Sequence, residues 1–64
     1  MKAIIKVGTV YKDPGEWGTY FVYDEKYEIE VENIETLKKQ LTKKYDGIYD
    51  IYINYKNIII ALVY

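Results

Sequence analysis

Hydrophobic and polar residues alternate along the first part of this chain, and a period of two is typical of a half-buried β-strand. Residues 2–11 follow this pattern and are rich in β-branched side chains. One face of the stretch carries Ala3, Ile5, Val7 and Thr9, and the other carries Ile4 and Val10. Because Pro14 presets φ and Gly15 tolerates positive φ, we expect a turn at residues 12–15.

Residues 19–31 alternate in the same way. One parity holds Phe21, Tyr23, Tyr27, Ile29 and Val31, and the other holds Asp24, Lys26, Glu28 and Glu30. This arrangement predicts a strand with one buried face and one face in water. Because the polar residues 24–26 interrupt the apolar pattern, the stretch is either one bent strand or two strands joined by a turn. We favour one long bent strand.

The spacing of apolar residues becomes helical after Asn33, which is a suitable N-cap. Positions 34, 37 and 41 are apolar and share one helical face, which continues to either Lys44 or Tyr45. Charged residues that complement the helix dipole occupy the first and last turns, namely Glu35, Lys43 and Lys44. The Asp-Gly pair at 46–47 is expected to end the helix.

Two further strands are expected near the end of the sequence. Residues 48–55 alternate, with Tyr49, Ile51, Ile53 and Tyr55 on one side and Asp50, Tyr52 and Asn54 on the other. A short turn at residues 56–57 leads into residues 58–64, which are apolar on both faces. Such a run predicts a central strand, although the pattern leaves open which parity of residues 58–64 faces the helix.

The elements therefore follow the order β-β-α-β-β within a single domain, residues 1–64. A right-handed crossover through the helix allows the first and last strands to lie side by side and parallel. These two strands also have the least polar alternation, as expected at the centre of a sheet. We predict an α+β fold with a four-stranded mixed sheet and one helix packed on one face.

Residues 27–48, YEIEVENIETLKKQLTKKYDGI, resemble the ubiquitin-like β-grasp superfamily in strand, cap, helical stripe and Asp-Gly exit. The second half of the chain is also similar to the immunoglobulin-binding domains of bacterial surface proteins. The resemblance implies a β-grasp-like fold. Ubiquitin-like modifiers and sulfur carriers react through a terminal Gly-Gly, whereas this sequence ends at Ala61–Tyr64. Conjugation and sulfur carriage are therefore not expected.

The composition argues against catalysis. Nine of the 64 residues are tyrosine, while Cys, His, Ser and Arg are absent. The chain thus lacks a thiol or serine nucleophile, a base that titrates near neutral pH, and the usual zinc ligands. Carboxylate pairs such as Asp46 and Asp50 have no spacing that specifies a metal or an acid–base pair. We expect no enzyme activity, no catalytic residues, no cofactor and no metal.

The charge and hydropathy of the chain bear on its location. A net charge of −1 creates no field that attracts nucleic acid or an anionic membrane. The longest apolar run is far shorter than the roughly 20 residues of a membrane span, and no signal peptide is recognised, so we expect a cytoplasmic protein. Heavy use of Ile, Tyr and Lys is typical of an AT-rich genome, which suggests a virus or mobile element.

The sheet face opposite the helix is the predicted functional surface. It is expected to carry Ile4, Val10, Tyr20, Val22 and Tyr52, with one parity of the last strand between them. An apolar patch bearing tyrosines usually marks a protein interface. We therefore expect a protein–protein interaction module that binds itself, as a homodimer, or a host protein. Trp17, between two glycines, is expected to be either a binding anchor or a lid on the core.

Two charged segments suggest alternatives. Lysines line one helical face, namely Lys38, Lys39, Lys43 and Lys44, and with exposed tyrosines they form a candidate nucleic-acid surface. An ordinary solvated helix explains the same lysines. Acidic residues are concentrated in residues 24–35, where they either attract a basic partner or prevent strands of two molecules from pairing at the sheet edge.

Overall fold

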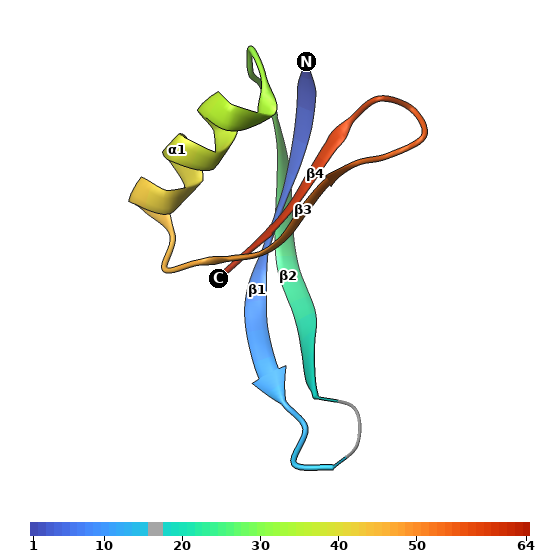
Figure 1. Ribbon diagram of the computed structural model, residues 1–64, viewed down its shortest axis with the longest axis vertical. Coiled ribbons are helices and arrows are strands. Elements are labelled where there is room, and N and C mark those ends of the chain that lie inside the picture. The colour runs from blue at the N-terminus through green and yellow to red at the C-terminus, as the bar shows by residue number, and fades with distance from the viewer. Residues whose placement is uncertain (16–17) are drawn as a thin grey trace.

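The computed structural model describes residues 1–15 and 18–64, which form four strands and one helix. In chain order the elements are β1 (Lys2–Lys12), β2 (Thr19–Glu30), α1 (Ile34–Lys44), β3 (Ile48–Ile53) and β4 (Ile59–Val63), as Figure 1 shows. The predicted order β-β-α-β-β is confirmed, and the second alternating stretch is one continuous strand rather than two.

The strands form one mixed sheet in the order β2-β1-β4-β3. The central pair, β1 and β4, is parallel, and each of these strands also pairs antiparallel with its own hairpin partner. α1 connects the two hairpins and packs on one face of the sheet (Figure 1). The α+β class, the mixed sheet and the parallel central strands are as predicted, and this order is compatible with a β-grasp topology.

The core lies between α1 and the sheet. Leu37 and Leu41 of the helix are buried against the central strands. The strand residues that meet them are Ala3 and Ile5 of β1 and Ile59, Ala61 and Val63 of β4, each fully buried. The odd-numbered residues of β4 therefore face the helix, which settles the parity that the sequence pattern left open.

Local contacts define both ends of α1. At the start, the Asn33 side-chain oxygen accepts a hydrogen bond of 2.8 Å from the Thr36 N–H, as expected of an N-cap. At the end, half-buried Tyr45 rather than exposed Lys44 continues the apolar stripe. Tyr45 leaves the helix with an extended backbone, so the helix ends where predicted without a left-handed glycine at Gly47.

The turn between β3 and β4 is built around the Asn54 side chain. Its oxygen accepts hydrogen bonds from the backbone N–H groups of Lys56 and Ile58, at 2.9 and 3.0 Å. Asn57 has a φ of 63°, in the left-handed region that asparagine tolerates better than most residues. These bonds begin the turn at Asn54, so β3 ends at Ile53, earlier than its alternation predicts.

A β-bulge changes the direction of side chains in β2. Val7 pairs with Glu25 and Gly8 pairs with Tyr23, so Asp24 is an extra residue in β2. Only glycine fits at position 8, because a Cβ there would lie 2.0 Å from the Val22 carbonyl oxygen. A bulge shifts the alternation by one residue. Residues of the same parity, such as all odd-numbered residues, therefore lie on one face of the sheet before the bulge and on the other face after it.

The bulge corrects two predictions about β2. Tyr20 and Val22 pair with Tyr11 and Thr9, which point to the same side of β1 as the core residues. They are therefore on the helix side of the sheet and not on the opposite face. Phe21 and Tyr23 are on the face opposite α1, rather than sharing a face with Tyr27 and Ile29 as strict alternation predicted.

A second bulge in β3 has a similar effect on Tyr49. Ile48 pairs with Val63 and Asp50 with Leu62, which leaves Tyr49 as the extra residue. Its ring stacks on Phe21, on the face opposite α1. Tyr49 thus lies on the same side as Tyr52, although the alternation placed these two tyrosines on opposite sides.

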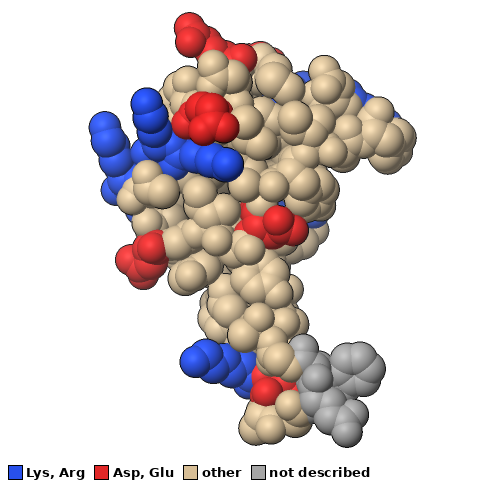
Figure 2. Space-filling model, in the orientation of Figure 1, with Lys and Arg blue, Asp and Glu red and all other residues tan. Residues whose placement is uncertain are grey.

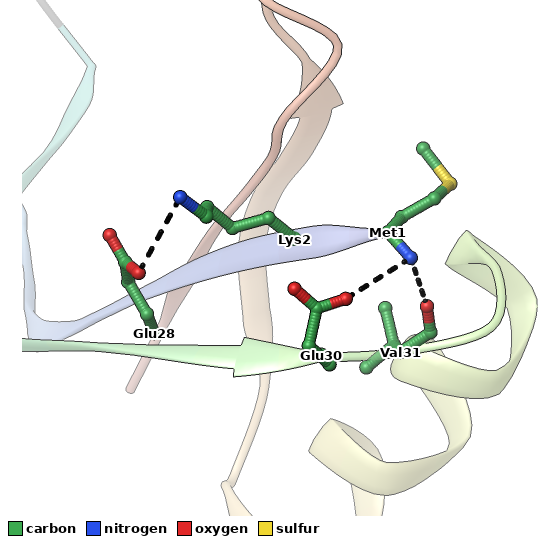
Figure 3. A network of polar contacts seen from close by, with 5 residues as sticks. All are labelled: Met1, Lys2, Glu28, Glu30 and Val31. Carbon is green, nitrogen blue, oxygen red and sulfur yellow. Dashed lines mark hydrogen bonds and ion pairs between the residues drawn. The ribbon is translucent and has the colours of Figure 1, made fainter.

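Polar contacts close the end of the β1–β2 hairpin near the chain start (Figure 3). The Met1 ammonium donates a hydrogen bond of 2.6 Å to the Val31 carbonyl oxygen and lies 3.5 Å from a Glu30 carboxylate oxygen. Lys2 forms a second ion pair with Glu28 at 3.9 Å. Because both carboxylates are well exposed, these ion pairs contribute little to stability, and the backbone bonds define this end.

The bulge at Gly8 leads to a stability prediction. We expect Gly8→Ala to lower the free energy of unfolding by about 1–3 kcal/mol, the usual range for overpacking, because the new methyl group meets backbone rather than a flexible side chain. Urea unfolding followed by circular dichroism measures the change. Gly15→Ala is the matched control, since its methyl group would meet only the Asp13 side chain, at 3.3 Å, and its effect should stay within about 1 kcal/mol. Equal unfolding midpoints for the two variants would contradict the bulge.

Candidate functional site

The face of the sheet opposite α1, here called the open face, carries an apolar and aromatic patch beside the charged residues Lys2, Lys6, Lys26, Glu28, Glu30 and Asp50. Pairing places eight apolar and aromatic side chains on it: Ile4, Val10, Phe21, Tyr23, Tyr49, Tyr52, Ile60 and Leu62. Ile60 is only 6% exposed, so its neighbours cover the centre of the face. Tyr23 and Tyr52 are each 44% exposed and present much of their rings to solvent. The centre of the open face is therefore closely packed, and exposed tyrosine rings lie around this centre.

The β1–β2 hairpin extends beyond the rest of the sheet. β4 pairs with β1 only as far as Val7, whereas β1 and β2 remain paired to Lys12 and Thr19. The segments Gly8–Lys12 and Thr19–Tyr23 together form a two-stranded projection, which we call the arm. The arm is visible below the body of the domain in Figures 1 and 2.

Tyr49 connects the arm to the body of the domain. Its ring stacks on Phe21 with a centroid distance of 5.4 Å and an interplanar angle of 21°. Its hydroxyl donates a hydrogen bond of 3.2 Å to the Thr19 carbonyl oxygen. Because Tyr49 belongs to β3 and Phe21 to β2, this contact joins the two outermost strands across the open face.

The other side of the arm carries a second aromatic pair. Tyr11 and Tyr20 are cross-strand neighbours whose rings stack with a centroid distance of 5.3 Å. Both rings remain almost half exposed, and Val22 beside them is 51% exposed. The arm therefore exposes apolar and aromatic surface that neither α1 nor the core covers.

Lys6 brings a positive charge onto the open face. It lies directly opposite Lys26 on β2, an arrangement that is unfavourable for two like charges. The Lys6 ammonium lies 4.8 Å from the centre of the Tyr23 ring, within the range of a cation–π contact. This contact partly offsets the repulsion and holds the ammonium beside the exposed ring.

The lysines proposed for nucleic-acid binding lie on α1, where Figure 2 shows basic side chains gathered. Lys38, Lys39, Lys43 and Lys44 are all exposed. Among these lysines and the aromatic rings that the structure describes, only Lys44 makes a close approach, at 5.3 Å from Tyr27 and 5.6 Å from Tyr45. The exposed tyrosines of the open face lie on the other side of the sheet, so they do not share a surface with these lysines.

Tyr27 and Tyr45 are joined by a hydrogen bond between their hydroxyls, 2.7 Å long. Burial of the Tyr45 ring raises the pKa of its hydroxyl above the ordinary value of 10.0, and the hydrogen bond with Tyr27 raises the pKa further. The pair links β2 to the end of α1. Its location next to Lys44, with the two hydroxyls bonded to each other, indicates a structural contact.

The predicted partner-binding residues fall into three groups. Ile4, Val10 and Tyr52 lie on the open face, as predicted. Tyr20 and Val22 lie on the opposite side of the arm, and Trp17 is outside the described residues. Sequence alternation missed Phe21, Tyr23 and Tyr49, because two bulges turned them onto the open face. The only local signals were Gly8 and the polar interruption at residues 24–26.

The part of the chain that the structure describes has neither a metal-binding cluster nor a pocket. Within residues 1–15 and 18–64, no three acidic side chains come together to hold a metal. The helix described here is not long and apolar enough to cross a membrane. The candidate surface is therefore an aromatic sheet face rather than a cavity.

Comparison with models of protein families, with curated proteins and with solved structures found no match to this chain.

The Tyr27–Tyr45 contact leads to a prediction about pH. The pKa of Tyr45 is higher in the folded protein than in the unfolded chain, so the neutral Tyr45 hydroxyl stabilises the fold. This contribution to stability is complete below pH 10 and is lost as the pH rises through the pKa of Tyr45 in the folded protein. Titration of tyrosinate absorbance should show a late component that disappears in Tyr45→Phe. Tyr55→Phe removes the hydroxyl of a tyrosine that is 91% exposed and should leave this component in place. If the high-pH part of the absorbance curve is the same in Tyr45→Phe as in the unchanged protein, the raised pKa does not belong to Tyr45.

Proposed function

We propose that this chain is a non-enzymatic module that binds another protein through its open face. The observation that carries the proposal is the group of exposed aromatic rings, Tyr23, Tyr49 and Tyr52, around an apolar centre. Tyrosine is among the residues that contribute most to binding at protein interfaces. Its ring supplies a large contact area while losing few rotatable bonds.

The position of these rings on strands also supports the proposal. The open face is built on strands rather than on loops, and Tyr49 is held by both its stack and its hydroxyl bond. Groups that are already ordered lose little conformational entropy on binding. A face on which the described residues form no pocket suits a protein surface better than a small molecule, which normally needs a concave pocket.

The composition supports one class of partner. Use of lysine as the only basic residue, together with abundant Ile and Tyr, is typical of an AT-rich genome such as those of many viruses. A host protein that this chain inhibits or recruits is therefore the first partner to seek.

A charge placed on the open face should prevent binding. We expect Tyr52→Glu to weaken binding by about 2 kcal/mol or more, roughly 30-fold in Kd, because the carboxylate would lose its hydration against an apolar partner. Affinity capture from extracts of the native host identifies the bound protein, and titration of that protein measures the change.

The matched control for this experiment is Tyr55→Glu. Tyr55 lies in the β3–β4 turn and is 91% exposed, so the same change there adds the same charge away from the open face. Both variants should retain the circular dichroism spectrum of the unchanged protein. If Tyr52→Glu and Tyr55→Glu bind the captured protein equally well, the open face is not the binding surface.

The alternative proposal is nucleic-acid binding through the lysines of α1. These four residues form a basic surface, but the open-face tyrosines are on the other side of the sheet. The exposed tyrosines on the helix side, Tyr11 and Tyr20, belong to the arm, which α1 does not reach. We therefore expect labelled single-stranded DNA and RNA to show no saturable binding at low salt. Binding that weakens steeply with salt and is lost when the four lysines become Gln would instead favour this alternative.

A further inference from the structure

The two halves of β2 differ in how strongly their outer edge discourages a further strand from pairing with it. Within the described residues, β2 has a neighbouring strand on one side only, so no strand pairs with the backbone groups of its other edge. In the arm, the Thr19 carbonyl oxygen accepts a hydrogen bond from the Tyr49 hydroxyl. Five of the seven residues from Asp24 to Glu30 are charged, and charge at an edge discourages a further strand from adding. No residue from Thr19 to Tyr23 is charged. The arm therefore has the unprotected part of the edge.

The arm also lacks the support that stabilises the rest of the sheet. From Gly8 to Lys12, β1 pairs only with β2, because β4 pairs with β1 no further than Val7. An isolated two-stranded ribbon is at best marginally stable in water. Tyr49 supports one side of the arm through Phe21, but Tyr20 and Val22 on the other side are 49% and 51% exposed. A third strand at this edge would give the arm further backbone hydrogen bonds and cover these side chains.

We propose that residues 19–23 of β2 pair antiparallel with the same residues of a second copy of this chain, about a two-fold axis at Phe21. In this register Tyr20 lies opposite Val22 of the second copy, and the two Phe21 side chains lie opposite each other. Aromatic pairs and pairs of aromatic with β-branched residues are favourable cross-strand neighbours. The segment is therefore complementary to itself.

The charges of β2 explain why a second copy fits at the arm and not elsewhere on this edge. A two-fold axis at any residue from Asp24 to Glu30 would bring at least one pair of like charges directly opposite each other. An axis at Asp24 or Glu25 opposes that residue with itself, and an axis at Tyr27 opposes Asp24 with Glu30. Like charges in such positions are destabilising. With the axis at Phe21, every opposed residue from Thr19 to Tyr23 is uncharged.

The pairing would join two sheets edge to edge into one continuous sheet, with both helices on one side and both open faces on the other. It uses the edge of β2 and not the open face, so it can be correct whether or not the open face binds another protein. A standard interface has about 20–30 residues on each side, many more than this segment supplies. We therefore expect a weak dimer whose population rises with protein concentration.

Two complementary variants test the register. Val22→Lys and Tyr20→Glu each place a charge at the seam, so each protein alone should remain monomeric where the unchanged chain dimerises in sedimentation velocity. Mixed together, they should form a heterodimer, because Glu at position 20 of one copy then lies opposite Lys at position 22 of the other. Circular dichroism checks that both variants are folded, and Val22→Thr, which remains uncharged and β-branched, should still dimerise.

The outcomes separate this proposal from the one for the open face. Dimerisation that is lost in both single variants, restored in their mixture and unaffected by Tyr52→Glu supports pairing at the arm. Dimerisation that is lost in Tyr52→Glu but retained in Val22→Lys would overturn the arm proposal and favour self-association through the open face. A chain that remains monomeric at every concentration would also overturn it, and would leave the open face available for a different protein.

Discussion

The parallel pairing of β1 with β4 is the contact on which the rest of this structure depends. Each strand belongs to a different hairpin, and each contributes fully buried residues to the core, among them Ile5 and Ile59. A parallel pair requires a long crossover connection, which is supplied here by α1. The helix must then cover one side of the pair with Leu37 and Leu41, and the open face is the side that remains.

The two bulges then determine the chemical character of the open face. Without them, strict alternation would leave Phe21 and Tyr23 on the helix side of β2 and Tyr49 on the helix side of β3. With them, the three rings join Tyr52 on the open face, and Tyr49 can stack on Phe21. The bulge beside Gly8 therefore supports the aromatic surface as well as the shape of the hairpin. Bulges are often found where a protein redirects a side chain for function.

The bulge in β2 also leaves the arm with aromatic and apolar side chains on both of its sides. Tyr11, Tyr20 and Val22 lie on its helix side, but α1 packs on the body of the domain and does not reach them. A domain of this size buries a smaller fraction of its surface than a larger one, so it has little core with which to stabilise a projection. The uncovered arm and the open face are two separate surfaces, and each has its own physical reason to be covered by another protein.

The sequence alone determined the order of the elements, the cap at Asn33, the helical stripe and the central position of the last strand. These properties follow from periodicity and local hydrogen bonding, which depend on neighbours along the chain. The tertiary structure alone decided which side of the sheet holds Phe21, Tyr49 and Val22. A bulge is a shift in register between two strands, so it is defined only when the strands meet, and single-strand alternation cannot reveal it.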